Sequence, residues 1–333
     1  MLLTAPCGAL AADIPLPDVP IVVDPATATA TPATVTPESI TPLTSELPQL
    51  SIDAAEPRYV APTRRDRIGR IWAPVLINGH GPFRLVLDTG ASRSGVNAQV
   101  AQALGVPTNR SPPIMLLGVT GRSTVPTILV DNLTVGDLML HPVTLPIVND
   151  PLGGAEGVLG IEGLTDKRVY IDFDHDLITI RRSHNERAPP GFLTIPILRS
   201  KQGLIMVDAR VGGIPVKAVI DTGGQSSIGN IAMREALAKH ERSQGRLEHV
   251  EGVTTDVQVG ESYASPPIML GTSLEMRGVR ITYGDMHIFE HWNLTREPVV
   301  LIGMDAIGTL ETVIIDYHRH EVQLRMHNGW FNG

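Results

Sequence analysis

One tripeptide occurs twice in this chain, and each copy ends an apolar run. Asp88-Thr89-Gly90 follows Arg84-Leu85-Val86-Leu87, and Asp221-Thr222-Gly223 follows Lys217-Ala218-Val219-Ile220. At ordinary residue frequencies, a given tripeptide arises by chance about once in several thousand positions. Two copies in the same strand-like context within 333 residues therefore indicate an internal repeat.

The repeat extends beyond the tripeptide. An asparagine stands at the same distance after each aspartate, at Asn97 and at Asn230. Asparagine side chains accept hydrogen bonds from the free amides of a first helical turn, so helices are predicted over 98–104 and 231–240. Each copy thus predicts a strand, a turn, a second strand, Asp-Thr-Gly and a helix, in that order.

Further along, each copy has an apolar-apolar-glycine element that is followed by an alternating hairpin. The members are Val158-Leu159-Gly160 with strands 170–173 and 177–181, and Leu301-Ile302-Gly303 with strands 314–317 and 321–325. The two hairpins have the same internal spacing. We therefore interpret the chain as a duplicated half, with a polar boundary near residue 190.

The chain divides into four parts, which are 1–12, 13–66, 67–190 and 191–333. The first is interpreted as the remnant of a secretory signal, which predicts a periplasmic or secreted protein. A lipid anchor on Cys7 is less favoured. The second is rich in Pro, Thr and Ala and predicts a disordered tether, with a cleavable pro-segment as the alternative. The last two parts are predicted to be lobes 1 and 2.

Composition favours an all-β fold and excludes several partners. The 32 glycines and 27 prolines, with few long helical patterns, are typical of strands joined by turns. The net charge of −8 argues against nucleic acid or an anionic membrane surface as a partner, and no apolar run is long enough to span a membrane. The single cysteine leaves neither lobe a thiol for catalysis or metal binding. No cofactor is expected.

Two lobes that pack about a pseudo-twofold axis would bring Asp88 and Asp221 side by side. Like charges a few ångströms apart cannot both ionise readily, so the pair would share one proton. One carboxyl group can then act as a base toward a water molecule that attacks a peptide carbonyl, while the other donates a proton to the carbonyl oxygen. These two aspartates are the candidate catalytic residues.

The other candidate residues support the turns or cover the site. Gly90 and Gly223 let backbone amides approach the carboxylates, and Thr89 and Thr222 are expected to bond across the axis. Two glycine-bearing hairpin tips are expected to fold over a bound peptide strand and to exclude water. The tip residues are Gly118, Val119, Thr120 and Gly121 in lobe 1, and Gly252 and Val253 in lobe 2.

These motifs resemble those of the aspartic proteases of retroviral and pepsin type, over roughly residues 72–325. Ala91 after the first turn is similar to retropepsins, whereas two lobes in one chain are similar to pepsins. The chain thus most resembles the bacterial retropepsin-like aspartyl proteases with fused lobes. The resemblance implies a monomeric aspartic endopeptidase acting on peptides or proteins. The alternative is a non-cleaving peptide-binding module that retains the fold.

Two further patterns suggest metal ions. The stretch from His287 to His291 matches H-x-x-E-H, a zinc pattern that requires a helix, but a strand is predicted over 287–289 and a strand end or loop after it. Asp172, Asp174 and Asp176 suggest calcium, but the equivalent lobe 2 turn lacks these carboxylates, so a solvated hairpin turn is predicted. No metal is expected.

Overall fold

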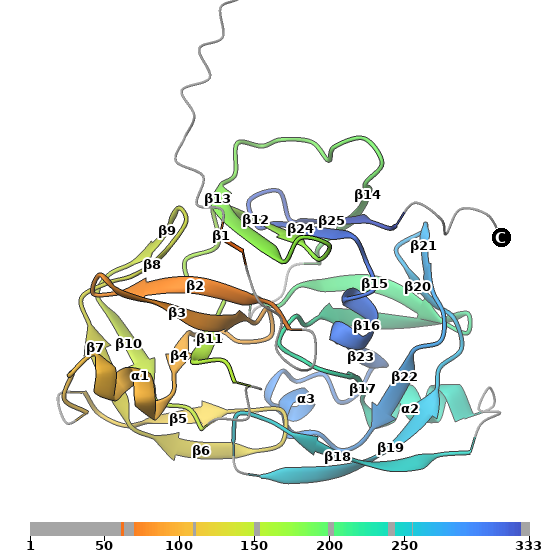
Figure 1. The fold of residues 1–333 in the computed structure, drawn as a ribbon. Coiled ribbons are helices and arrows are strands. Elements are labelled where there is room, and N and C mark those ends of the chain that lie inside the picture. Colours follow the sequence, from red (N-terminus) through yellow and green to blue (C-terminus); the bar gives the residue numbers. More distant parts are fainter. Residues whose placement is uncertain are drawn as a thin grey trace, which may run out of the picture. The chain divides into compact units, whose positions relative to one another are not determined.

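Strands dominate the fold, and the predicted all-β class is confirmed (Figure 1). The computed structural model describes residues 61–62, 70–108, 111–149, 154–198, 203–238, 244–254 and 256–327. The predictions for residues 1–12 and for nearly all of 13–66 lie outside the described residues. Within the described ranges, no helix has the length and apolarity needed to cross a membrane.

The first Asp-Thr-Gly turn lies at the end of a strand inside a six-stranded sheet. In pairing order, its strands are β4 (Gly95–Val96), β11 (Gly157–Leu159), β3 (His80–Leu87), β2 (Trp72–Ile77), β8 (Leu133–Val135) and β9 (Leu138–Leu140). Strand β11 runs parallel to β3, and the Asp88 amide donates to Leu159 O at 2.9 Å. The apolar-apolar-glycine element therefore holds the start of the turn.

The second turn repeats this arrangement in a nine-stranded sheet. The strands in pairing order are β18 (Arg246–Glu251), β19 (Val257–Ala264), β22 (Arg280–Tyr283), β17 (Ser227–Gly229), β23 (Val299–Ile302), β16 (Ile214–Ile220), β15 (Met206–Val211), β20 (Ile268–Leu270) and β21 (Leu274–Met276). The order from β17 to β21 matches the order of the first sheet, strand for strand. The Asp221 amide donates to Ile302 O at 3.0 Å, as Asp88 does to Leu159.

Two sheets of two strands each complete the first half, and four short helices accompany the sheets in the described ranges. The first is the hairpin of β5 (Ile114–Leu117) with β6 (Arg122–Val125), and the second pairs β7 (Thr127–Val130) with β10 (Val143–Pro146), with β8 and β9 between them in the chain; the helices are α1 (Ala98–Ala103), α2 (Ile231–Leu237), α3 (His287–His291) and α4 (Met304–Ile307). The predicted caps are confirmed, because Asn97 and Asn230 accept hydrogen bonds from the amides of Val100 and Met233, both at 2.9 Å.

The strand predicted over 287–289 is wrong, because these residues belong to helix α3. The Trp292 amide donates to Ile288 O at 2.9 Å, and Ile288, Phe289 and Trp292 are buried together in one apolar cluster. Apolar residues at spacings of one and four positions fit a helical period better than the alternation of a strand.

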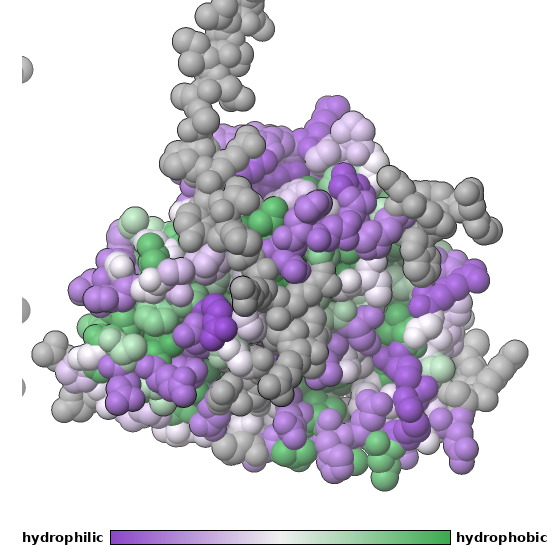
Figure 2. All heavy atoms as spheres, in the orientation of Figure 1, coloured by the Kyte–Doolittle hydropathy of each residue, from purple (hydrophilic) through white to green (hydrophobic). Residues whose placement is uncertain are grey.

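A third sheet joins the two halves of the chain. Its strands in pairing order are β1 (Ala61–Pro62), β13 (Leu177–Arg182), β12 (Lys167–Asp172), β24 (Thr312–Asp316), β25 (Glu321–Arg325) and β14 (Leu193–Pro196). The two predicted hairpins thus pair with each other through β12 and β24. Polar side chains cover the visible face of this region, at the top of the view in Figure 2.

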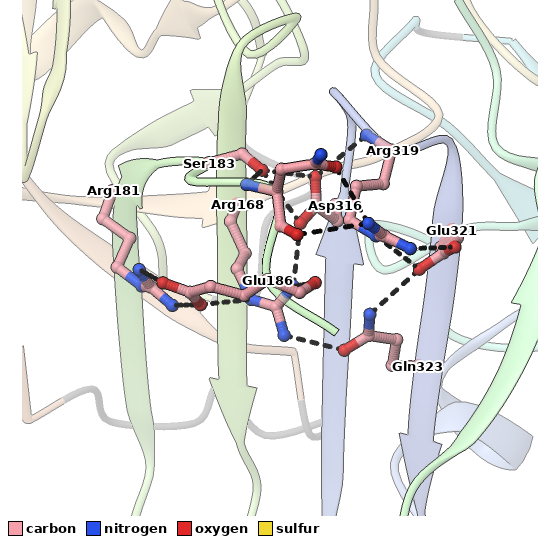
Figure 3. A network of polar contacts seen from close by, with 9 residues as sticks. Arg168, Arg181, Ser183, Glu186, Asp316, Arg319, Glu321 and Gln323 are labelled. Carbon is pink, nitrogen blue, oxygen red and sulfur yellow. Dashed lines mark hydrogen bonds and ion pairs between the residues drawn. The ribbon is translucent and has the colours of Figure 1, made fainter. Parts of the chain in front are cut away.

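The joining sheet contains a buried ion pair. Arg168 Nη1 donates to Asp316 Oδ2 at 2.7 Å, and Nη2 of the same guanidinium donates to Gln323 Oε1 at 2.7 Å. Arg168 and Asp316 are 3% and 0% exposed. Ser183 also donates to the Asp316 carboxylate, so each charged group has several partners (Figure 3). This network connects strands from both halves.

Candidate active site

The two Asp-Thr-Gly turns contact each other through their threonines. The Thr89 amide donates to Thr222 Oγ1 at 3.2 Å, and the Thr222 amide donates to Thr89 Oγ1 at 3.1 Å. Each hydroxyl in turn donates at 2.6 Å to a carbonyl of the other half, Ile220 O for Thr89 and Leu87 O for Thr222. The predicted bonds across the axis are confirmed. Each turn makes the same hydrogen bonds to the other, so a local twofold axis relates the two turns.

Replacing Thr222 with valine is expected to destabilise the protein by about 2–3 kcal/mol, because it leaves the buried Thr89 amide and Leu87 carbonyl without partners at roughly 1–3 kcal/mol for each orphaned group. Valine has nearly the shape of threonine, so packing changes little. The measurement is urea unfolding, with Thr222→Ser as the matched control that keeps the hydroxyl. Equal unfolding midpoints for the valine and serine variants would contradict the assigned role.

The carboxyl groups of Asp88 and Asp221 lie within hydrogen-bonding reach of each other. Asp88 Oδ1 accepts from the amides of Gly90 and Ala91 at 2.8 and 3.0 Å, and Asp221 Oδ1 accepts from the two amides that follow Thr222 at 2.9 and 3.1 Å. The Gly-Ala and Gly-Gly sequences therefore hold their carboxylates in the same way.

The turn glycines have a second role that sequence reasoning missed. A Cβ atom at Gly90 would stand 3.0 Å from Asp221 Oδ1, and one at Gly223 would overlap the Asp88 carboxyl group. Each glycine thus faces the carboxylate of the other half. A side chain at either position would push the two aspartates apart.

Burial and the neighbouring Asp221 charge raise the pKa of Asp88 to about 8. Burial also raises the pKa of Asp221, but the Gly223 amide, the hydrogen bond from Asp88 and the positive charge of Arg70 act in the opposite direction. Because the pKa of Asp88 is raised above neutral pH, the pair keeps one proton at pH 7 and shares it between the two carboxyl groups.

Arg70 makes the site asymmetric. It is 6% exposed, and its Nη1 lies 3.5 Å from Gly223 O. Ile71 O accepts a hydrogen bond from the Leu87 amide of β3, and Ile205 O accepts one from the equivalent Ile220 amide of β16. Arg70 and Leu204 precede these two isoleucines, so they occupy the same place in the two halves. A cation therefore stands where the second half has an aliphatic side chain. The second copy of the repeat has no cation at this place, so a comparison of the two copies does not point to Arg70.

Two serines behind the turns were also missed. Ser94 Oγ accepts from the Gly160 amide at 3.1 Å, and Ser227 Oγ accepts from the Gly303 amide at 3.2 Å. Each serine stands six residues after its aspartate, so a longer comparison of the two repeats would have found them. They fix the apolar-apolar-glycine elements to the turns.

The tips of hairpins β5–β6 and β18–β19 lie side by side, at the bottom of the view in Figure 1. Thr120 Oγ1 and Thr254 Oγ1 lie 3.1 Å apart and are buried. Val119 packs on the apolar cluster of the second half, whereas Val253 packs on that of the first. The predicted tip residues are thus brought together, with Gly118 and Gly252 facing Thr254 and Thr120. Gly121 closes the first tip by accepting from the Gly118 amide at 2.8 Å.

A cavity of about 810 Å³ lies between the turns and the hairpins. Asp88, Asp221 and Arg70 line it, together with strands β5 and β18. In the described part of the chain, β5 pairs only with β6 and β18 only with β19. Among the described strands, each of the two therefore has one edge without a partner strand, and the main chain of an extended peptide can pair with such an edge.

The two metal patterns have different outcomes. The H-x-x-E-H stretch lies on α3 instead of the predicted strand end or loop, and His291 lines the cavity. Within the described ranges, no group of three or more His, Cys, Asp or Glu side chains is placed to hold a metal ion. Asp172 Oδ1 accepts from the amides of Asp174 and His175 at 3.1 Å each, which is a hairpin turn, as predicted.

Comparison with known proteins supports the same chemistry for the first half. Residues 73–162 match the family model described as aspartyl protease. The match runs from β2 past Gly160 and includes Asp88, whereas the second half lies outside it. No curated protein matches the chain. The segment that carries the first turn is thus similar to an aspartyl protease domain.

Proposed function

We propose that this chain is a two-lobed, retropepsin-like aspartic endopeptidase that hydrolyses peptide bonds with a water molecule activated by Asp88 and Asp221. The observation that carries the proposal is the approach of the two carboxyl groups to within hydrogen-bonding reach across two equivalent turns. The family match of the first turn supports it. Export to the periplasm or the cell exterior is part of the proposal and rests on the sequence of residues 1–12.

The proposed reaction needs no covalent enzyme intermediate. Asp221, as the carboxylate, takes a proton from the water while the water oxygen bonds to the peptide carbonyl carbon. Asp88 donates its proton to the carbonyl oxygen, which gives a neutral tetrahedral diol. Asp221 then transfers the proton that it took from water to the amide nitrogen, and one hydroxyl proton of the diol returns to Asp88. The C–N bond breaks, a carboxylic acid and an amine are released, and the pair again holds one proton.

The test is cleavage of a reduced, unfolded protein by the purified full-length chain in ¹⁸O-labelled water. Mass spectrometry is expected to find new peptide termini, each new carboxyl group carrying one solvent oxygen. The Asp221→Asn variant serves as the control for contaminating proteases. Peptide binding without any new termini would instead support the non-cleaving binding module.

The pH profile of kcat/KM is expected to be bell-shaped, because only the singly protonated pair supplies both an acid and a base. The alkaline limb is expected near the pKa of Asp88, which burial and the Asp221 charge raise to about 8; above it the pair loses its last proton and its acid. The measurement uses a neutral fluorogenic peptide between about pH 3 and 10. Activity that still rises above about pH 9 would contradict the assignment.

A further inference from the structure

The cavity walls differ in chemistry although equivalent strands form them. Ile114 and Glu248 each stand four residues before the glycine that opens the hairpin tip of their half. Leu116 and Val250 stand two positions further along the chain, closer to the tip. All four are half-buried, while Met115 between the first pair is exposed and the residue between the second pair is exposed as well. Glu248 therefore takes the inward-facing place that an isoleucine has in the first half.

The partner of Glu248 differs between the halves in the same way. Glu248 Oε2 accepts from Thr282 Oγ1 at 2.9 Å, and Thr282 is buried. Thr282 is the residue before Tyr283, which pairs in parallel with Gly229 at the end of β17. The equivalent residue of the first half is Pro146, which stands before Ile147, the parallel partner of Val96 at the end of β4. A carboxylate with a hydroxyl donor thus replaces two apolar side chains, which is a positioned polar group in only one wall.

The Glu248 carboxylate has capacity for a further partner. Its side chain is 38% exposed, and it forms a long ion pair with Arg246, whose Nη2 lies 4.0 Å away on a side chain that is itself 65% exposed. One hydrogen bond from Thr282 uses a small part of the acceptor capacity of an ionised carboxylate. An exposed ion pair of this length contributes little, so a ligand cation can displace it.

The cavity wall beside Glu248 is apolar. Val250, Ile228 and Leu301 line the cavity, and Ile228 lies in register with Thr282 on one side and with Leu301 on the other. Ile228 and Leu301 belong to a buried apolar cluster on which Val250 packs. A lysine or arginine side chain can lay its aliphatic stem along such a surface and keep its charged head at a polar end. An aspartate or glutamate would meet the Glu248 charge and be disfavoured.

We infer that Glu248 is a specificity-determining residue, which makes the second-half pocket select a substrate side chain with a long aliphatic stem and a cationic end, lysine or arginine. The inference rests on the proposed function and names its substrate class. Ile114 and Pro146 leave the equivalent pocket of the first half apolar. The chain therefore prefers a basic residue on one side of the scissile bond and an apolar residue at the matching position on the other side.

The experiment uses pairs of peptides that differ at one position, lysine in one and norleucine in the other. Norleucine keeps the stem and lacks the ammonium group. The position is moved through several residues on both sides of the scissile bond, and the ratio of kcat/KM for the two peptides is measured with the full chain. We expect a preference for lysine of about tenfold or more at one position, as a charge-assisted hydrogen bond gives.

Three variants locate the source of the preference. Glu248→Gln is expected to lower the lysine-to-norleucine ratio about tenfold. Glu235→Gln removes one exposed negative charge outside the cavity and is expected to leave the ratio unchanged. Ile114→Glu is expected to create a new lysine preference at the matching position on the opposite side of the scissile bond. A wild-type ratio near one at every position, or a ratio that Glu248→Gln does not lower, overturns the inference.

Binding separates this inference from the proposed function. The dissociation constants of the same peptide pairs are measured with Asp88→Asn protein by fluorescence polarisation. A lysine preference in binding that Glu248→Gln removes supports the inference even if the wild type cuts no peptide, an outcome that counts against the proposed function alone. Equal affinities for both peptides at every position overturn the inference, whether or not cleavage occurs.

Discussion

Replacing Asp221 with asparagine is expected to lower kcat/KM for peptide hydrolysis by about 10²–10⁴-fold, the usual contribution of a positioned acid or base. An amide cannot take a proton from water, and it breaks the sharing of one proton between the two side chains. Asp88→Asn is expected to have a similar effect, because the carbonyl oxygen then loses its proton donor. The measurement is cleavage of one fluorogenic peptide at the pH optimum of the wild type.

Stability provides the control for this loss of activity. The asparagine oxygen can still accept from the amides that hold Asp88 Oδ1 or Asp221 Oδ1.

Because the pKa of Asp88 is raised to about 8 in the folded protein, the unfolded chain binds fewer protons between about pH 4 and 8, and the free energy of unfolding falls across this window as pH rises. Asp88→Asn removes this dependence, so at pH 7 it should unfold at the same urea concentration as the wild type or a higher one. Peptide cleavage by a folded Asp88→Asn or Asp221→Asn variant at the wild-type rate would exclude the dyad.

Replacing Asp316 with alanine is expected to destabilise the protein by about 3–5 kcal/mol, the usual cost of leaving a buried charge without its partner. Arg168 would keep a 3% exposed guanidinium and lose the carboxylate that lies 2.7 Å from it, which leaves the Glu186 carboxylate at 3.8 Å as an ionic partner. Ser183 would lose an acceptor. The measurement is urea unfolding followed by two probes, with coincident curves as the condition for a single transition.

Two further variants show whether the cost comes from burial of the charge. Asp208→Ala breaks an ion pair with Lys217 whose aspartate is 70% exposed, so a change below about 1 kcal/mol is expected. The double variant Arg168→Met with Asp316→Leu removes both charges and is expected to recover most of the lost stability. If Asp316→Ala costs no more than Asp208→Ala, the buried pair does not stabilise the joining sheet.

Much of each half could be predicted because its signals are local. The Asn97 cap, the positive φ of 51° at Asn78 in the first hairpin and the apolar run at the end of β3 depend on residues close in sequence. The pairing of β12 with β24 could not be predicted, since the alternation within a hairpin does not specify which other hairpin lies beside it. The strand predicted over 287–289 rests on two adjacent apolar residues, Ile288 and Phe289. So short a run does not distinguish the period of a strand from that of a helix such as α3.

The site was predictable where the two halves are alike and unpredictable where they differ. Asp88 and Asp221 stand out because the motif around them occurs twice. Arg70 and Glu248 have Leu204 and Ile114 in their places, so a comparison of repeats passes over them. Their effect depends on a cavity that closes only when strands from both halves and the hairpin tips come together. Side chains that break the symmetry of a duplicated site need the three-dimensional arrangement to be recognised.

The crossed anchoring of Val119 and Val253 has a kinetic consequence. Movement of hairpin β5–β6 away from the cavity removes Val119 from the apolar cluster of the second half, and movement of β18–β19 removes Val253 from that of the first half. Either movement also breaks the contact between Thr120 and Thr254. In the proposed endopeptidase, entry of a polypeptide and release of its fragments therefore require both hairpins to open together, and the frequency of that opening is expected to set a ceiling on turnover.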